Sequence, residues 1–414
     1  MPYLAEAELQ AFLDQLWTKW EREPHLFRQP FSRPLVTQRE YWGVLKSWAR
    51  EVRAGKRFSQ PKWIEAGLLP ADTDADVGAF CRRVEASYSG DWYLYQADGV
   101  QHWSPEIWHR ATELLRPLIQ RAGGLPPGGM MLDLFLGKYD RTPTGIHRDE
   151  GEVLAFVTAG PKRLHFWPRE RFEAPWASGE RTHFQTGIWS YEKHLDDAIT
   201  LEAEPGDVIY WPRSYYHLGA SSDHWSGMVT LTMWWQASAQ RAIRFIVDAL
   251  LRGDPSPASY PVEIERMGAA ARALPAALVA AAANARRDLD SGWDDVLAEG
   301  WARLVTGYGF LQPPGRVPVP VIGPDRYVVR HPIAVVTIAG RRVVFACGHR
   351  AHALEADSGI ATGRLESLAV GDVVAAEGAF GAPPAETESL LAALHSVGAP
   401  VSYTHLTLPT KRIV

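Results

Sequence analysis

The chain has 414 residues and a hydrophobic fraction of 46%, enough for two or three domains with a substantial core. Its net charge of −5 comes from 43 basic and 48 acidic residues mixed along the chain, which argues against a nucleic-acid-binding surface. Cys81 and Cys347 are the only cysteines, so we expect no disulfide framework and a cytoplasmic location. The N-terminus predicts no signal peptide, and the apolar run from Pro275 is too short to span a membrane.

Residues 1–124 predict helices that complete the core of the region that follows. Residues 5–22 place apolar side chains on one helical face. The segment TQRE at 37–40 is a capping box for a second helix. Ser104 as N-cap and Pro105 as first residue predict a third helix.

Residues 125–240 have a different pattern. Segments such as GMMLDLFLGKYD, AITLEAEPGDVIYWP and MVTLTMWWQA are short, apolar or alternating, and are separated by glycine, proline and polar turns. This pattern is typical of the strands of a β-sandwich or barrel.

The remaining residues predict two further parts. An Ala-rich helical connector covers 241–311, and the Pro/Gly-rich run QPPGRVPVPVIGPD marks a boundary. Residues 320–400 predict a small α+β module, winged-helix-like, with a hairpin that turns at Ala339-Gly340 and a helix in ETESLLAALHSVGA. The module has no basic recognition stripe, so a peptide-binding or dimer-supporting role is favoured over nucleic-acid binding.

The last fourteen residues form a separate case. The run VSYTHLTLPT within 401–414 resembles one translated reading frame of transposase-adapter DNA from sequencing libraries. We therefore expect this tail to be an artefact and leave it out of the fold prediction.

Three residues of the β-rich region predict a metal site. His147 and Asp149 are two apart, so on a strand both side chains lie on the same face. His217 follows EPGDVIYWPRSYY, in which a turn precedes a strand that ends at a proline. Two histidines and one carboxylate on one side of a metal leave open coordination positions, as in non-heme Fe(II) oxygenases.

This interpretation has a structural alternative. A His-x-Asp triplet occurs by chance about once in such a chain, and His147 with Asp149 could form only a hydrogen-bonded pair. A second triplet, His194 to Asp196, lies in a charged segment and is interpreted as solvated surface. The run CGHRAH, from Cys347, offers at most three zinc ligands and is interpreted as packing.

Lys162 strengthens the metal hypothesis. It lies fifteen residues after His147, beyond the Gly160-Pro161 turn, so a hairpin can return its ammonium group to the same cavity. A buried lysine needs an anion, and no acidic partner is adjacent in sequence, so a ligand carboxylate is a candidate. A surface position in the hairpin is the alternative.

These segments together resemble the JmjC group of cupin-like, Fe(II)- and 2-oxoglutarate-dependent oxygenases. The matching features are the His-x-Asp triplet, GPKRLHFWP, EPGDVIYWPRSYYH and TLTMWW, with WEREPHLFRQPF near the start as weaker support. The resemblance is clear over 125–237 and implies a double-stranded β-helix core. Members from bacteria often add a helical dimerisation segment and a winged helix, so a homodimer through the connector is an expectation.

The resemblance also implies roles for individual residues. His147, Asp149 and His217 would bind Fe(II), and Lys162 would pair with the distal carboxylate of 2-oxoglutarate. Thr144 would hydrogen-bond the same carboxylate, although a plain turn residue is an equal alternative. Thr232 occupies the position on the closing strand where many members carry an asparagine.

The function implied by the resemblance is hydroxylation of an amino-acid side chain in a protein or peptide. A small-molecule or natural-product substrate is the nearest alternative. A catalytically silent cupin-like binding protein and a metal-dependent cupin enzyme without 2-oxoglutarate are alternatives from other classes. Histone-type demethylation is disfavoured because no methyl-lysine reader region is found.

Overall fold

The structure, a computed structural model, divides into two compact units. The first unit contains the described residues up to 235 together with 307–316, and the second contains 292–306 and those from 326 onward. The described residues are 3–55, 69–96, 99–172, 183–185, 188, 190–221, 224–235, 292–316, 326–355, 358–368, 372–375, 380 and 383–402.

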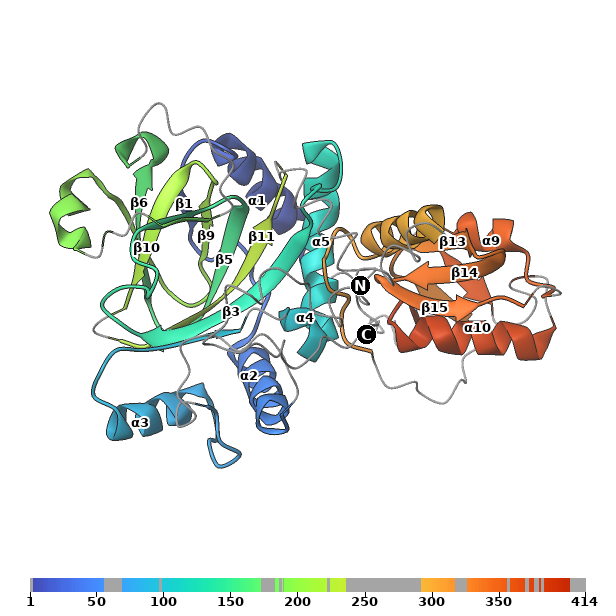
Figure 1. Cartoon of the computed structure of the whole chain (residues 1–414), viewed down its shortest axis with the longest axis horizontal. Coiled ribbons are helices and arrows are strands. Elements are labelled where there is room, and N and C mark those ends of the chain that lie inside the picture. The colour runs from blue at the N-terminus through green and yellow to red at the C-terminus, as the bar shows by residue number, and fades with distance from the viewer. Residues whose placement is uncertain are drawn as a thin grey trace, which may run out of the picture. The chain divides into compact units, whose positions relative to one another are not determined.

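The first unit contains helices and two antiparallel sheets (Figure 1). Its helical segments are α1 (Glu6–Lys19), α2 (Gln38–Arg53), α3 (Val77–Ser87), α4 (Val100–Trp103), α5 (Pro105–Ala122), and the 3₁₀ segments η2 (Arg169–Arg171) and η3 (Tyr191–Asp197). Its strands are β1 (His25–Phe27), β2 (Trp92–Gln96), β3 (Met130–Lys138), β4 (His147–Asp149), β5 (Glu152–Ala159), β6 (Lys162–Pro168), β7 (His183–Gln185), β8 (Ile199–Ala203), β9 (Val208–Trp211), β10 (Tyr215–Ala220) and β11 (Ser226–Met233).

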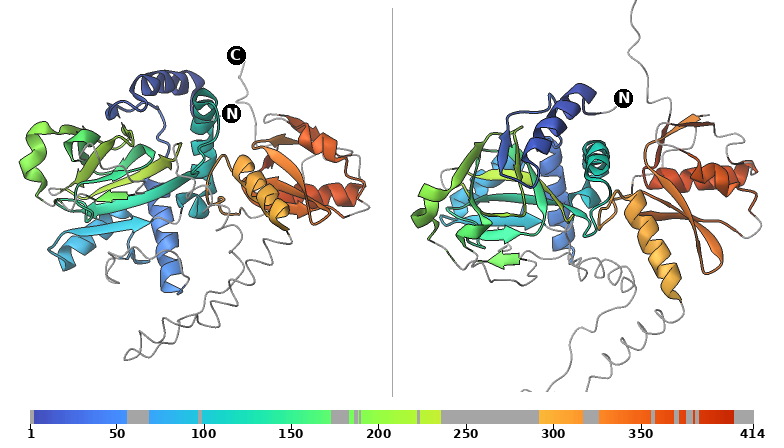
Figure 2. Two further views of the ribbon diagram at one scale, coloured as in Figure 1. Left: turned by 45° about the horizontal axis from the view of Figure 1, so that its top comes forward. Right: turned by 90° about the horizontal axis from the view of Figure 1, so that it is seen from above.

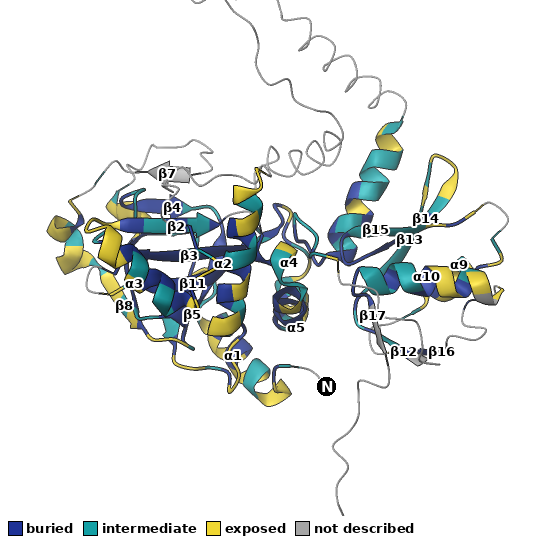
Figure 3. Ribbon diagram, turned by 90° about the horizontal axis from the view of Figure 1, so that it is seen from below, coloured by how far each residue is buried: buried dark blue, intermediate teal, exposed yellow. Residues whose placement is uncertain are grey.

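The larger sheet has the strand order β1-β9-β5-β11-β3-β2. Every residue of β5 and β11 is buried, because one face of these strands points into the protein and the other is covered (Figure 3). Helix α2 contacts β5 and helix α4 contacts β3, and Tyr41 of α2 donates a hydrogen bond of 2.6 Å to the backbone oxygen of Phe135. Buried on both faces, these strands form a rigid support for the turns between them.

The smaller sheet has the strand order β7-β4-β10-β6-β8. It shares an apolar interior with the larger sheet, since one cluster combines side chains from β5, β6, β8, β9 and β11. The members of this cluster are Val153, Ala155, Val157, Leu164, Phe166, Ala203, Ile209, Trp211 and Met228. The two sheets therefore pack face to face, and residues that alternate with the cluster along each strand point away from it.

The second unit combines helices with two three-stranded sheets, ordered β16-β12-β17 and β13-β14-β15 (Figure 2). Its elements are a helix over 292–306, β12 (Arg326–Val329), β13 (Ile333–Ile338), β14 (Arg341–Ala346), β15 (His349–Ala353), α9 (Thr362–Glu366), β16 (Val373–Ala375), α10 (Pro384–Ser396) and β17 (Pro400–Ser402). Among the described residues, no helix is long and apolar enough to cross a membrane.

Several sequence predictions are confirmed. The chain is of the α+β class, Thr37 and Glu40 form the predicted capping box, and α5 begins at Pro105. Strands β13 and β14 form the hairpin that turns at Ala339-Gly340. Strands β1 and β2, which extend both edges of the larger sheet, were not expected within the predicted helical region.

Other predictions stay open. Residues 236–291, which contain most of the predicted connector and its Ala-rich run, lie outside the described residues. The same holds for 403–414 of the tail, while Val401 and Ser402 pair with β12. The domain boundaries at 125, 241 and 320 and the winged-helix-like character of the C-terminal module stay predictions.

Candidate metal centre

Strands β4 and β10 bring the two predicted histidines together. The strands are antiparallel neighbours, and His147 and His217 are directly paired across them. Directly paired residues share a face of the sheet. The two imidazole rings consequently lie with their centroids 4.2 Å apart.

Asp149 completes a three-residue cluster. It lies two positions after His147 on β4, so it is on the same face, and its Oδ2 is 3.6 Å from Nε2 of His217. One potential ligand atom from each of His147, Asp149 and His217 lies within 4.8 Å of the others. The histidines are buried, while the Asp149 side chain is 32% exposed, so the cluster opens on the carboxylate side.

The imidazole of His147 is held in a defined orientation. Its Nδ1 lies 2.9 Å from the backbone oxygen of Gly145 and 3.0 Å from the hydroxyl of Thr144. A proton on Nδ1 donates to the Gly145 oxygen, which leaves the lone pair of Nε2 for a metal ion. Two imidazoles and one carboxylate are a donor set that suits Fe(II) with open coordination positions. The residues present therefore fit the metal that the sequence predicts.

Lys162 is buried at the start of β6. Only 2% of the residue is exposed, and among the described residues no carboxylate pairs with it. Its ammonium group donates to the Tyr139 hydroxyl and lies 4.4 Å from the centroid of that ring. Burial lowers the pKa of Lys162 to about 7.

Gly219 connects Lys162 with the metal cluster. It lies two residues after His217 on β10, so a Cβ there would point to the same face as the His217 side chain. That Cβ would be 3.1 Å from the Lys162 Nζ and 3.3 Å from the Thr142 methyl carbon. The glycine therefore leaves space through which the Lys162 ammonium reaches the face that carries the metal ligands.

Thr142 borders the same space over Gly219, and the sequence predicts no role for it. Its hydroxyl is buried and has no hydrogen-bond partner among the described residues, while its backbone N–H donates to the Gly219 oxygen at 2.9 Å. The predicted residue, Thr144, instead contacts the imidazole of His147. No sequence signal separates the two threonines, because both lie in the irregular segment between β3 and β4.

Thr232 lies on β11, where its backbone pairs with both β3 and β5. Its methyl carbon is 2.6 Å from the place that a Cβ on Gly151 would occupy. Thr232 therefore packs against the turn that begins two residues after Asp149. The Thr232 side chain thus lies close to the residues that follow strand β4. Its contact with a cosubstrate stays a prediction.

Aromatic side chains line the neighbouring strands β2 and β3. The rings of Tyr95 and Phe135 stack at 4.6 Å, and Tyr93 contacts the Tyr139 ring edge-to-face at 5.3 Å. Burial raises the pKa of the Tyr93 phenol, with smaller contributions from neighbouring tyrosines and from the charges of Asp133 and Asp149. Tyr93 and Tyr95 are half-buried, and the charge of Asp149 is one of those that raise the pKa of Tyr93.

The other candidate metal residues are not brought together. His194 and Asp196 lie on η3, and Arg171 contacts Nδ1 of His194 at 3.4 Å. Cys347 is buried in a turn, and His349 lies on β15. Across the described part of the chain, His147, Asp149 and His217 form the single group of three metal-ligating side chains.

Comparisons with known proteins give distant similarities. No protein-family model matches the chain, and no curated protein matches it. Among solved structures, ycfD of Escherichia coli is 18% identical with a TM-score of 0.48, covering 94% of this chain and 97% of that chain. A structure described as the E. coli ribosomal oxygenase YcfD with cobalt and 2-oxoglutarate is 16% identical with a TM-score of 0.44 and the same coverage.

A third solved structure is described as SnoN, a non-heme α-ketoglutarate-dependent epimerase from nogalamycin biosynthesis. It is 14% identical with a TM-score of 0.31, and the alignment covers 54% of this chain and 84% of that chain. At these identities and TM-scores, similarity assigns no activity to this chain. The functional proposal therefore rests on the residues of the metal centre and its surroundings.

Proposed function

We propose that this chain is an Fe(II)- and 2-oxoglutarate-dependent oxygenase that hydroxylates an amino-acid side chain in a protein or peptide. In this proposal the two packed sheets form a double-stranded β-helix of the cupin type. His147, Asp149 and His217 hold Fe(II). When bound, Fe(II) and 2-oxoglutarate supply oxidation of a substrate C–H bond by O₂, with conversion of 2-oxoglutarate to succinate and CO₂.

The observation that carries the proposal is the buried ammonium of Lys162 beside the metal ligands. Burying a charge without an opposite charge is costly, and Lys162 has no carboxylate partner among the described residues. The space over Gly219 directs this ammonium to the face that carries His217. A metal-dependent cupin enzyme that does not use 2-oxoglutarate would not need a buried lysine at this position. A dicarboxylate bound at the metal supplies the missing charge.

The chain's own residues then have separate tasks. Lys162, with the hydroxyls of Tyr139 and Thr142, binds the distal carboxylate through charge-assisted and neutral hydrogen bonds. Because Thr142 has an unused buried hydroxyl, we assign it the role that the sequence predicts for Thr144. Gly145 and Thr144 instead hold the His147 imidazole in the tautomer that can bind a metal.

The accessible aromatic wall supports a side-chain substrate. Tyr93, Tyr95 and Phe135 offer flat apolar surface, and the Tyr95 hydroxyl is 3.4 Å from the Asp133 carboxylate. Such a wall can hold an extended side chain beside Asp149 and exclude water from it. A homodimer through the predicted connector belongs to the same proposal, with 236–291 outside the described residues.

Succinate formation tests the proposed function. Purified full-length protein is incubated with Fe(II), 2-oxoglutarate and O₂, and succinate is measured for the wild type and for His147→Ala. We expect metal-dependent succinate from the wild type and none above background from the variant. Peptides and lysate proteins from the same reaction are then searched by mass spectrometry for the addition of one oxygen atom. Wild-type protein that retains iron but forms no succinate would contradict the proposal.

A further inference from the structure

Strand β8 forms an open edge of the smaller sheet. Its five residues, Ile199–Ala203, pair with β6 on one side in an unbroken antiparallel register. On the other side, the backbone of β8 makes no hydrogen bond to any residue that the structure describes. A strand edge with unpaired N–H and C=O groups is a template on which a further strand can pair.

Side chains on one face hold β8 firmly against β6. Nδ1 of His165 lies 2.9 Å from the Thr200 hydroxyl, and Arg163 donates to the Glu202 carboxylate at 2.8 Å. Proteins usually protect a sheet edge with a proline, a lysine, a bulge or a very short strand. Strand β8 has no proline, no lysine and no bulge, and it is longer than the three-residue edge strands β1 and β7. Its edge is therefore both well ordered and unprotected.

The other face of β8 leaves apolar surface uncovered. Ile199 pairs with Phe166 and Leu201 pairs with Leu164, and these two partners belong to the apolar interior cluster. Leu201 is only half-buried, and Ile199 and Leu195 are each 36% exposed. Apolar side chains on an added strand would lie beside Ile199 and Leu201 and extend the interior cluster.

The ends of β8 are acidic. Between positions 196 and 204 the chain has four acidic residues and no basic one. Asp197 pairs with Arg171 at 3.0 Å, and Glu202 pairs with Arg163. Asp196, before the strand, and Glu204, directly after it, are exposed and form no ion pair with a described residue. A basic partner therefore complements both ends of this edge.

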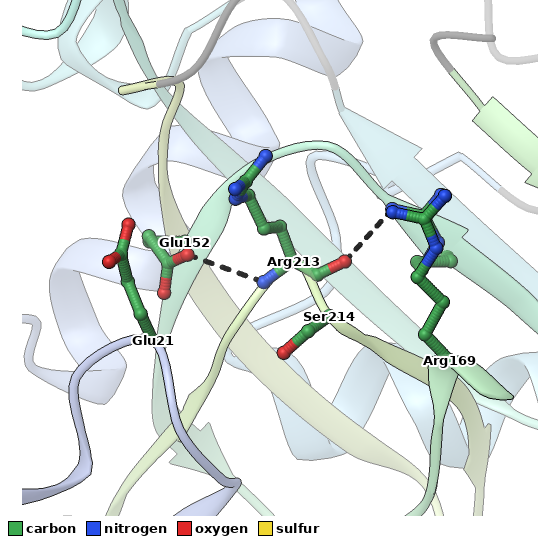
Figure 4. A pocket seen from close by; sticks show the side chains of 6 residues that line it. Glu21, Glu152, Arg169, Arg213 and Ser214 are labelled. Atoms are coloured by element: carbon green, nitrogen blue, oxygen red, sulfur yellow. Dashed lines mark hydrogen bonds between the residues drawn. The ribbon is translucent and has the colours of Figure 1, made fainter. Parts of the chain in front are cut away.

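The polar pocket beside the turn before β10 has a different character (Figure 4). Arg148 donates to the backbone oxygen of Arg213 at 3.0 Å, and the Arg213 backbone N–H donates to Glu152 at 3.4 Å. Glu152 also accepts a hydrogen bond from the Tyr210 hydroxyl. These groups already have partners within the protein, whereas the outer edge of β8 is open.

We propose that the outer edge of β8 binds an extended, basic segment of a partner protein as an additional strand of the smaller sheet. Backbone hydrogen bonds hold the added strand, its alternate apolar side chains cover Ile199 and Leu201, and its lysines or arginines lie near Asp196 and Glu204. This inference does not depend on the proposed oxygenase activity, because β8 carries none of the metal or cosubstrate residues.

A second copy of this chain fits the edge poorly. Antiparallel pairing of two β8 strands sets Asp196 and Asp197, before one strand, against Glu202 and Glu204, at the end of the other. Like charges on paired strands are destabilising. The expected occupant is therefore a basic segment of a different protein.

Peptide binding to the full-length protein tests the proposal. The probe is a capped peptide in which three valines alternate with two threonines and two lysines stand at each end. One control has glutamates in place of the lysines, and another is N-methylated at the five central residues, which removes their backbone donors. We expect the lysine peptide to bind more weakly as salt is raised, and each control to bind at least about tenfold more weakly.

Variants locate the binding surface. Ile199→Lys places a positive charge on the edge and should weaken binding of the lysine peptide at least about tenfold. Tyr88→Lys is the matched control, because Tyr88 is also 36% exposed but precedes β2, at the far edge of the larger sheet. It should bind as the wild type does. The double variant Asp196→Asn with Glu204→Gln, which changes only exposed residues, should lose about twofold to tenfold and show a weaker salt dependence.

Hydrogen exchange shows where the peptide binds. Amide exchange within 199–203 should slow when the lysine peptide is present. The proposal is overturned if the N-methylated peptide binds as tightly as its parent, or if protection appears elsewhere and not in β8. It is also overturned if the wild type forms a dimer that Ile199→Lys dissociates, because a second copy then occupies the edge. Circular dichroism verifies that each variant is folded, and succinate formation is measured separately.

Discussion

The chain contains two His-x-Asp triplets, and they lie in different kinds of secondary structure. His147 and Asp149 lie on strand β4, where residues two apart share a face, and β10 adds His217 opposite. His194 and Asp196 lie on the 3₁₀ segment η3, where residues two apart do not share a face. The same residues at the same spacing therefore form a cluster of potential metal ligands in one region and a polar surface segment in the other.

The difference shows that a spacing becomes a site only through its secondary structure and its partner strand. Near the first triplet, the buried Lys162 on β6 approaches Gly219 on β10, two residues after His217. The second is surrounded by charged side chains, including Arg171, which pairs with Asp197. Replacing residues in each region tests the distinction.

The largest effect is expected from the metal ligands themselves. His147→Ala and Asp149→Ala should each weaken Fe(II) or Mn(II) binding by more than about a hundredfold, because outer partners of metal ligands alone contribute about tenfold to a hundredfold. His194→Ala should bind metal as the wild type does. The metal content of each variant after dialysis measures the expected loss and the expected retention. Loss of metal in His194→Ala with retention in His147→Ala would show that the wrong triplet was chosen.

Removal of the Lys162 charge should have the next largest effect. Lys162→Met keeps an unbranched apolar side chain but leaves the distal carboxylate of 2-oxoglutarate buried and unpaired. Breaking a buried ion pair costs about 3–5 kcal/mol, so affinity for 2-oxoglutarate should fall at least about a hundredfold. Metal binding should be unchanged, since the ligands are untouched. Lys162→Arg should retain more affinity than Lys162→Met because the charge remains.

The two threonines before β4 provide a finer comparison. Thr142→Val should weaken 2-oxoglutarate binding about tenfold to a hundredfold, because a hydrogen bond to a charged group contributes about 1.5–3 kcal/mol. Thr144→Val should act mainly on metal affinity, through the His147 imidazole. Titrations with metal and with 2-oxoglutarate separate the two effects. If Thr142→Val weakens mainly metal binding and Thr144→Val weakens mainly 2-oxoglutarate binding, the cosubstrate role belongs to Thr144.

A further expected effect is on the pH dependence of stability. Burial lowers the pKa of Lys162 to about 7 from an ordinary value of 10.5. Between these values the unfolded chain binds more protons than the folded protein, so the free energy of unfolding rises with pH through this group. Lys162→Met should lack this rise. Chemical denaturation of the ligand-free protein at about pH 7 and about pH 9 measures it, and identical pH dependence in both proteins would refute the assignment.

The sequence predicts the parts of the site that depend on local spacing. The shared face of His147 and Asp149 follows from the two-residue repeat of a strand. The return of Lys162 to the same cavity follows from the length of a hairpin. Thr142 was missed because its relation to Gly219 depends on the fold of an irregular segment. Strands β1 and β2 were missed because they are short, with three and five residues, and lie among predicted helices.

Metal-dependent binding of 2-oxoglutarate tests the central claim most directly. The cosubstrate is titrated calorimetrically into Mn(II)-loaded wild type, Mn(II)-loaded Lys162→Met, and His147→Ala under the same conditions. The proposed function predicts one binding event in the wild type, a loss of at least about a hundredfold in Lys162→Met, and none in His147→Ala. Equal affinity in all three proteins would contradict the claim that the triad and Lys162 form one cosubstrate site.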